Sequence, residues 1–265
     1  MSKENKFLKD MTKGTPWKLL LQFAVPLFIG NIFQQLYNMV DSIIVGNFVG
    51  PNALGAIGTT NSLNFLFFSL VAGLSVGIGI IVAQFFGSNN EEKVKDTIGN
   101  AIWIVLISSV IMACIGFFIA KPVLVLLRTD KVILGDATAY LKVTSIGICC
   151  TGLYNGVSSI LRALGDSKTP LIFLIFASLV NVVLDLWFVL GLGWGVVGAG
   201  VATAFSQFLS AVTCIFYAYK SNTYFRLKKK NLKLNSYIVE KSLRLGIPVA
   251  LQNSLIAFSL IVLQA

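Results

Sequence analysis

Long stretches without a charged residue dominate this sequence. A helix that crosses a membrane needs about 20 mostly apolar residues, so most of these stretches fit one crossing. They cover residues 19–40, 42–90, 97–120, 143–161, 169–184, 186–219 and 245–265. Charged residues make up 12% of the chain, against roughly 25% in soluble domains. The sequence therefore predicts a membrane protein and excludes a soluble globular domain.

Some of these charge-free stretches do not correspond to one helix each. Run 42–90 holds the end of one helix, a turn at NFVGPN (47–52) and a second helix. Asp185 alone separates two later runs, and we place it inside a helix because GLGWGVVG (191–198) supplies a turn soon after it. The predicted fold is all-α, with transmembrane helices at about 17–45, 54–86, 97–120, 136–162, 169–190, 196–219 and 242–265.

Basic residues are distributed unequally between the two sides of this layout. Of the 21 Lys and Arg residues, 17 fall in the N-terminal tail and in the loops at 87–96, 162–168 and 220–244. This asymmetry places the N-terminus in the cytoplasm. The net charge of +10 is then explained by the orientation of the chain in the membrane and by attraction to lipid headgroups. We therefore expect no nucleic-acid partner. Arg162 belongs to the loop at 162–168 in this layout, so no basic residue is expected within a span.

Two acidic residues, Asp41 and Asp185, fall within predicted helices, whereas the other nine lie in the tail, in loops or at helix ends. A charged side chain at the middle of a bilayer costs about 2.5–3.5 kcal/mol on insertion scales, and such residues usually face a cavity or the bundle interior. One alternative places both carboxylates at the outer membrane boundary, where they are tolerated. The other places them beside one cavity, as an ion-binding site.

Polar residues on the same helix faces favour the ion-binding site. Asn181 lies four residues before Asp185, and Tyr37 and Gln34 lie four and seven residues before Asp41, on the carboxylate's side of each helix. Further polar groups are supplied by Tyr140, Asn155, Ser158 and Thr203. Oxygen and amide groups around two carboxylates suit either a monovalent cation such as Na⁺ or a bound proton.

The sequence does not indicate an enzyme. It contains no His, and no nucleophile, oxyanion-binding group or metal cage is recognisable beside the two carboxylates. We expect no cofactor beyond a coupling ion. The four cysteines lie in apolar runs and are interpreted as small buried apolar residues. Pro26 interrupts the first helix, where it is either a static packing device or a hinge.

Three segments carry a family resemblance. QFAVPLFIGNIFQQLYNMVDSIIVGNFVG (22–50), LRALGDSKTP (161–170) and NVVLDLWFVLGLGWGVVGAGVATA (181–204) resemble the multidrug and toxic compound extrusion (MATE) transporters of prokaryotes. The resemblance implies twelve helices in two six-helix lobes around a central cavity. It also implies export of organic cations and other amphipathic compounds across the plasma membrane in exchange for H⁺ or Na⁺, by alternating access.

The resemblance also assigns residues. The ion or proton site falls on Asp41, Asp185, Asn181, Thr203, Tyr140 and Asn155, with possible Na⁺ ligation by Asp41, Asn181, Asp185 and Thr203. The bending proline falls on Pro26. Candidates for the substrate cavity are Gln34, Tyr37, Phe33, Phe65 and Ser158. Ser158 stands where an Asn is common in the family, so the hydrogen bonding around Asp41 differs from the family pattern.

The chain is shorter than such transporters, which have about 450 residues. Aligning Pro248 with Pro26 also aligns Asn253 with Asn31, so 242–265 resembles the first helix of a second repeat. We therefore expect a six-helix lobe at 1–220, a basic cytoplasmic inter-lobe loop at 221–241 and an incomplete second lobe from 242. On this view the chain is a partial protein, whose partner is the missing carboxy-terminal lobe or a second copy.

Two other functions are compatible with parts of this pattern. A flippase for a lipid-linked oligosaccharide would share the two-lobe architecture, but it is expected to line its cavity with basic residues for a pyrophosphate, and none is predicted inside the spans. A non-transporting membrane scaffold is the other alternative for a truncated chain.

Overall fold

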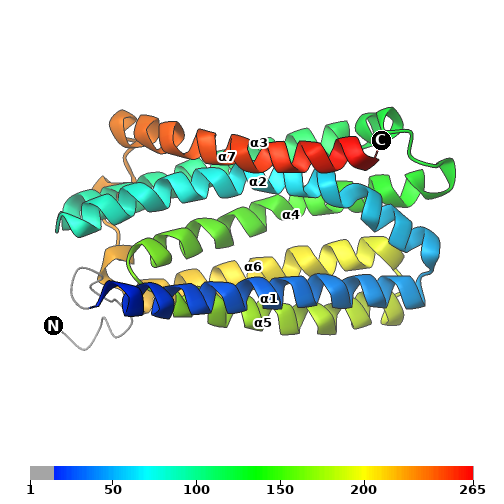
Figure 1. The fold of residues 1–265 in the computed structure, drawn as a ribbon, viewed down its shortest axis with the longest axis horizontal. Helices are drawn as coiled ribbons and strands as arrows, with labels where there is room; N and C mark the ends of the chain where they lie inside the picture. Colours follow the sequence, from blue (N-terminus) through cyan, green and yellow to red (C-terminus); the bar gives the residue numbers. More distant parts are fainter. Residues whose placement is uncertain (1–14, 265) are drawn as a thin grey trace.

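The computed structural model describes residues 15–264, a bundle of long α-helices (Figure 1). The helices are α1 (Pro16–Phe48), α2 (Pro51–Gly87), α3 (Glu91–Leu126), α4 (Lys131–Ala163), α5 (Lys168–Asp185), α6 (Gly195–Ser221) and α7 (Ser236–Gln264). Short helical turns follow α5 and α6: a π-helical turn η1 (Leu186–Gly191) and the 3₁₀ turns η2 (Thr223–Phe225) and η3 (Lys229–Leu232). Seven helices, with α5 and η1 counted together, are long and apolar enough to cross a membrane. The predicted all-α membrane fold is confirmed.

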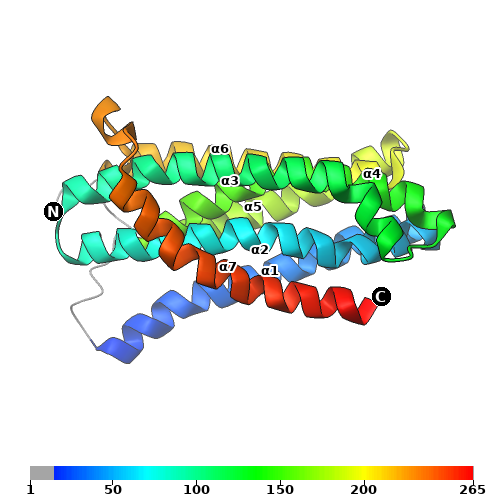
Figure 2. The same cartoon turned by 90° about the horizontal axis from the view of Figure 1, so that it is seen from above.

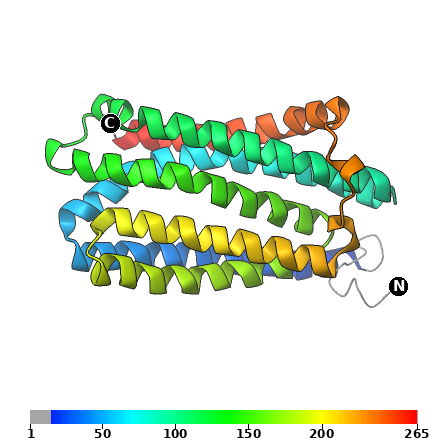
Figure 3. The same cartoon turned by 180° about the vertical axis from the view of Figure 1, so that it is seen from behind.

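The helices run side by side along the long axis of the molecule. In Figure 1, α2, α3 and α7 lie along one side and α1, α5 and α6 along the other, with α4 between them. The view from behind in Figure 3 shows the same two groups. Because successive helices alternate in direction, the segments 88–90, 164–167 and 222–235 share one end with the start of α1. The basic tail residues Lys3, Lys6, Lys9 and Lys13 lie outside the described residues.

Several helices extend beyond the predicted apolar spans. The predicted third helix began at 97, but α3 begins at Glu91, where the Asn90 side chain accepts a hydrogen bond from the Lys93 backbone N–H at 3.1 Å. Asp130 caps α4 in the same way, accepting from the Val132 N–H at 3.0 Å. Such caps satisfy backbone donors that the first turn of a helix leaves free. Polar residues therefore prolong these helices past the charge-free core.

The cysteines were all expected to be buried, and the structure corrects this for one of them. Cys214 is buried and Cys149 and Cys150 are partly buried, but Cys114 is exposed. It lies on α3 among exposed apolar side chains such as Val110, Ile111 and Phe118. An apolar outer surface of this kind suits lipid contact, so a cysteine there needs no protein neighbours to cover it.

Close contact between α2 and α7 depends on small residues. A Cβ atom added to Gly77 would lie 2.5 Å from the backbone nitrogen of Gly246, and one added to Gly73 would collide with the backbone of Ala250. The side-chain oxygens of Ser69 and Ser254 also lie 3.2 Å apart. Figure 2 shows α7 crossing α2 obliquely. Small residues allow membrane helices to approach this closely, so α7 is an integral part of this packing.

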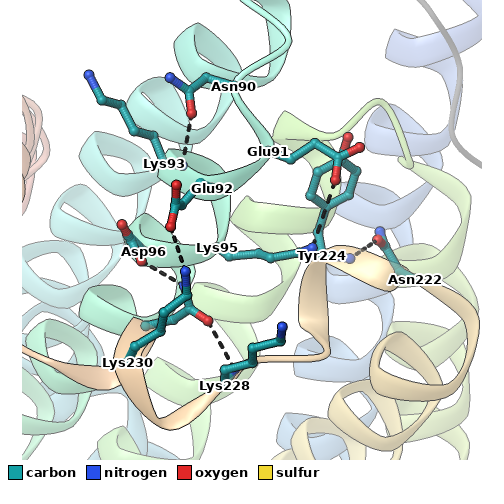
Figure 4. A network of polar contacts seen from close by, with 11 residues as sticks. Asn90, Glu91, Glu92, Lys93, Lys95, Asp96, Asn222, Tyr224, Lys228 and Lys230 are labelled. Carbon is teal, nitrogen blue, oxygen red and sulfur yellow. Dashed lines mark hydrogen bonds and ion pairs between the residues drawn. The ribbon is translucent and has the colours of Figure 1, made fainter.

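The segment between α6 and α7 is folded onto the beginning of α3 (Figure 4). The Asn231 side-chain amide donates to Asp96 Oδ1 at 2.7 Å. Asn100 donates to the Lys233 carbonyl at 3.2 Å and accepts from the Asn235 N–H at 2.8 Å. An ion pair between Lys230 and Glu92 raises the pKa of the Lys230 ammonium above its ordinary value. This basic segment is therefore docked on the bundle. The division of the chain into two lobes on either side of it stays a prediction.

Candidate functional site

Two carboxylates are buried in the half of the bundle formed by α1, α5 and α6. Asp41 on α1 is 7% exposed, and Asp185, the last residue of α5, is 0% exposed. Among residues 15–264 no Lys or Arg forms an ion pair with either of them. Within this described part, Asp41 Oδ1 and both carboxylate oxygens of Asp185 also lack a hydrogen-bond partner. The two acids predicted to form a site are thus buried without a protein counter-charge.

The helical geometry changes directly after Asp185, in a turn that packs against α1. The α-helical pattern of α5 ends at Asp185 and continues as the π-helical turn η1. Val189 of this turn packs in one buried apolar cluster with Ile44 and Val45 of α1. The ring of Phe188 stacks on that of Trp194, with centroids 5.3 Å apart, which ties the turn to the start of α6. π-helical turns are rare and often mark functional sites.

Polar side chains accompany the two acids. Asn181 is 1% exposed, and its side-chain N–H donates to Thr203 Oγ1 at 3.4 Å, while its Oδ1 lacks a donor. Tyr140 is buried, and both Tyr140 and Tyr37 lie near enough to Asp41 and Asp185 to interact with them electrostatically. The structure therefore gathers most of the predicted ion site into one cluster of α1, α4, α5 and α6 side chains.

A cavity of about 750 Å³ opens beside this cluster. It is lined by residues of α1, α2, α4, α5 and α6. Of the predicted site residues, those that line it are Pro26, Gln34, Tyr37, Phe65, Asn155 and Thr203. The cavity lining does not include Asp41, Asp185, Asn181 or Tyr140. Tyr37 and Thr203 belong to both the cluster and the cavity wall. Asn155 uses its side-chain N–H on the Thr151 carbonyl of its own helix, at 2.8 Å.

Two predicted cavity residues, Phe33 and Ser158, are not among those that line this cavity. Phe33 is partly buried on α1. Ser158 is buried within α4, and its backbone carbonyl accepts a hydrogen bond from Arg162 Nε at 3.2 Å. Periodicity could place both residues near the predicted site, but it does not fix the direction in which a helix turns its side chains.

The sequence interpretation overlooked a stripe of amide side chains on α1. Asn31, Gln34, Gln35 and Asn38 all line the cavity. Their spacing of three, four and seven residues is that of one helix face, so this stripe was visible in the sequence. Asn64 on α2, Asn155 on α4 and Gln207 on α6 complete the amide lining, and no spacing rule connects those three residues to α1.

The expectation that the spans hold no basic residue was wrong. Arg162 was placed in a loop, but α4 extends to Ala163, and Arg162 in its last turn lines the cavity. The loop begins later because Leu164 and Gly165 still bond back to α4: the Leu164 N–H donates to the Ile160 carbonyl and the Gly165 N–H to that of Arg162.

Comparison with known proteins agrees with this architecture. The MatE family model matches residues 26–187 of this chain. The chain belongs to the MatE family. The members of this family are transporters and not enzymes, and this MatE chain is a multi-pass membrane protein of that multidrug efflux family.

Individual relatives show the same likeness. The chain is 32% identical to the probable multidrug resistance protein YpnP of Bacillus subtilis over 244 residues, which cover 92% of this chain and 54% of that protein. It is 24% identical to the multidrug export protein MepA of Staphylococcus saprophyticus, over 95% of this chain and 56% of that one. An outward-facing structure of a multidrug resistance MATE transporter matches with a TM-score of 0.86 at 27% identity, over 95% and 56% of the two chains. This MatE chain thus spans about half the length of the relatives it matches.

Proposed function

We propose that this chain forms one lobe of a cation-coupled efflux antiporter. The transporter exports amphipathic compounds, organic cations among them, by alternating access in exchange for H⁺ or Na⁺. It acts in the plasma membrane of a bacterium or archaeon, with the N-terminus in the cytoplasm. The observation that carries this proposal is a set of four buried acceptor oxygens that find no donor among residues 15–264: Asp41 Oδ1, Asn181 Oδ1 and both carboxylate oxygens of Asp185.

Such a set is unstable unless something positive joins it. A buried carboxylate without a partner carries a large desolvation cost, and a second carboxylate nearby adds repulsion. A proton on one carboxyl group, or a Na⁺ ion held by carboxylate and amide oxygens, removes both costs. A cation that binds here therefore stabilises the cluster, and its arrival or departure changes what Asp41 and Asp185 require of their surroundings.

Helix α1 offers a route from this cluster to the cavity. Asp41 and Tyr37 lie on the same helix as Pro26, and both Tyr37 and Pro26 line the cavity. Proline removes a backbone hydrogen bond from a helix interior and favours bending there. In the proposed cycle, cation binding at Asp41 and Asp185 changes the bend of α1 and competes with substrate. A membrane potential supplies about 2.3 kcal/mol per charge per 100 mV to such exchange.

We also propose that the working transporter has two lobes, with residues 1–220 in the first, 221–241 as the inter-lobe segment and α7 at the start of the second. The coverage of about half of each relative supports this division. The second lobe is either a continuation of the chain or a second copy. Sizing and crosslinking in detergent separate these from the scaffold alternative, in which this chain associates with a different protein.

The proposal is tested by Asp41→Asn and Asp185→Asn, with Asp136→Asn as the matched control, because Asp136 is an exposed carboxylate on α4. Binding of ²²Na⁺ to the purified chain and acid-dependent thermal stabilisation measure the two candidate ions separately. Dye efflux from cells that express the two-lobe protein measures transport. Loss of ion binding and of efflux in the two site variants, but not in Asp136→Asn, is expected. Unchanged ion dependence and efflux in both would refute the proposal.

A further inference from the structure

Among residues 15–264, one charged side chain lines the cavity. Of the residues that line it, Arg162 alone is ionised at neutral pH, and the others are amides, hydroxyls and apolar groups. Asp41 and Asp185 are not part of the lining. The surface that meets a substrate is therefore positive at the Arg162 end, although the nearby ion site is acidic.

The guanidinium of Arg162 is only partly used by the protein. Its Nε donates to the Ser158 carbonyl at 3.2 Å, and no carboxylate among residues 15–264 forms an ion pair with it. The nearest acid in sequence, Asp166, is occupied elsewhere. Its Oδ1 accepts from the Lys168 and Thr169 N–H groups at 3.1 and 2.9 Å, and its Oδ2 accepts from the Thr169 hydroxyl at 2.6 Å.

A purely structural role accounts for part of this arrangement. An arginine in the last turn of a helix interacts favourably with the carbonyl end, and the Nε bond to Ser158 does this for α4. That role uses one of the five N–H donors of the side chain. It does not explain why the group lines a cavity, where the two terminal nitrogens form a planar fork suited to a carboxylate or phosphate.

The adjacent lining strengthens the case for a polar ligand at this end. Ser167, at the N-terminus of α5, also lines the cavity, and its side chain makes no capping bond. The hydroxyl of Tyr154 does not donate to a ligand at this end of the cavity, because it donates to the Pro170 carbonyl at 2.7 Å. Asn155 and Thr151 lie about two and three helical turns before Arg162 and also line the cavity.

We propose that Arg162 is a specificity-determining residue of the cavity, which binds an anionic group (carboxylate, sulfonate or phosphate) on an amphipathic substrate. The substrate range then includes zwitterionic and anionic amphipathic molecules, in addition to organic cations. This inference rests on the proposed transport function for its biological meaning, but it concerns binding at the end of α4 and is tested without transport.

The test uses two dyes that differ in one charge. Rhodamine B carries a free carboxylate, and its ethyl ester lacks that anion but keeps the cationic ring system. Binding of each dye to the 265-residue chain in phosphatidylcholine nanodiscs is measured by fluorescence anisotropy. We expect the unmodified chain to prefer rhodamine B. In Arg162→Gln its Kd should rise by about tenfold or more, as the loss of a charge-assisted hydrogen bond implies, while the Kd of the ester changes little.

Two further variants keep the result interpretable. Arg162→Lys retains the charge without the planar fork and should give an intermediate Kd. Lys168→Gln removes an exposed positive charge close by in the sequence, outside the cavity lining, and should change neither dye's binding. An equal loss of both dyes in Arg162→Gln, or no loss, would overturn the proposal. If Arg162→Gln does not fold by circular dichroism and sizing, equal binding of the two dyes by the unmodified chain overturns it alone.

Competition identifies the source of the anion. Displacement of rhodamine B by dihexanoyl phosphatidate supports the proposed site and assigns a lipid phosphate to it. Failure of phosphatidate to displace the dye supports the site for soluble amphipathic anions. The dye preference is measured without any ion gradient, so absence of ²²Na⁺ binding and of acid-dependent stabilisation in the unmodified chain would refute the coupling proposal alone, and equal binding of the two dyes would refute this one alone.

Discussion

The side-chain amide of Asn181 donates to the hydroxyl of Thr203 across 3.4 Å and thereby joins α5 to α6 one helical turn before Asp185. This bond uses the amide N–H₂ group and leaves Asn181 Oδ1 as a buried acceptor without a donor. An amide held in this orientation adds an oxygen to the two carboxylates. We expect this orientation to favour a cation among these oxygens over further hydrogen-bond donors from the protein.

Thr203→Val tests this orientation, because valine keeps the shape and removes the hydroxyl. We expect the amide to lose its fixed orientation and the chain to lose about 0.5–1.5 kcal/mol of stability. Affinity for the coupling ion should fall several-fold, measured by the Na⁺-dependent or acid-dependent rise in melting temperature. Thr203→Ser keeps the hydroxyl and serves as the control. Unaltered ion affinity in Thr203→Val would remove Thr203 from the site.

Gly77→Ala should weaken the contact between α2 and α7. The added Cβ would lie 2.5 Å from the Gly246 nitrogen and 2.7 Å from the Ser242 carbonyl oxygen, so backbone must shift. Overpacking of this kind costs about 1–3 kcal/mol, which thermal unfolding in detergent should detect. Gly58→Ala on the same helix is the matched control, because its Cβ meets nothing within 4 Å. Equal melting temperatures for the two variants would contradict the close packing.

Asn231→Ala should release the segment between α6 and α7 from α3. Asn231 is buried, donates to Asp96 and accepts from the Lys228 N–H at 2.9 Å, so its loss removes both hydrogen bonds, one of them to a partly buried carboxylate, at about 1–3 kcal/mol. Faster trypsin cleavage after the lysines at 228–233 is the expected readout. Glu92→Gln removes only the exposed ion pair with Lys230 and should have little effect, because exposed pairs contribute little. Similar cleavage rates in both variants would show that the docking does not depend on Asn231.

Pro26→Ala separates the hinge from the packing role. Alanine restores a backbone donor to α1 and should raise the melting temperature, while efflux by the two-lobe protein falls by about tenfold if bending at this residue gates transport. Pro122→Ala is the comparison, because Pro122 lies inside α3 and outside the cavity lining. A static role for Pro26 predicts efflux as high as in Pro122→Ala.

Much of the fold could be predicted because charge is excluded from the membrane core. The charge-free runs 42–90, 97–120 and 143–161 locate the second to fourth helices without any knowledge of packing. The ends of the helices were less predictable, since caps such as Asn90 and Asp130 carry them past the apolar core. Asp185 was correctly placed within a helical segment, but the change to π-helical geometry after it depends on tertiary packing against α1.

The candidate site was also predictable only in part, and the cost of burying charge again explains which part. Asp41 and Asp185 were recognisable because a buried charge is costly wherever its helix faces. Arg162 was not recognisable as a cavity residue, because a basic residue at a helix end ordinarily reaches water. Its direction depends on how far α4 continues and on what lies beside it. The docking of Asn231 on α3 was hidden for a related reason, since it joins residues more than 130 positions apart.

The docked segment and the glycine contact have a mechanical consequence for any second lobe that continues from α7. The fourteen residues 222–235, if extended, could reach across about 46–50 Å, enough for a loose tether. They are instead fastened to α3, and α7 rests on α2 with almost no clearance at Gly77. We expect a lobe attached there to rotate about the axis of α2. The range of that rotation would be limited by packing against the bundle and not by the length of a flexible linker.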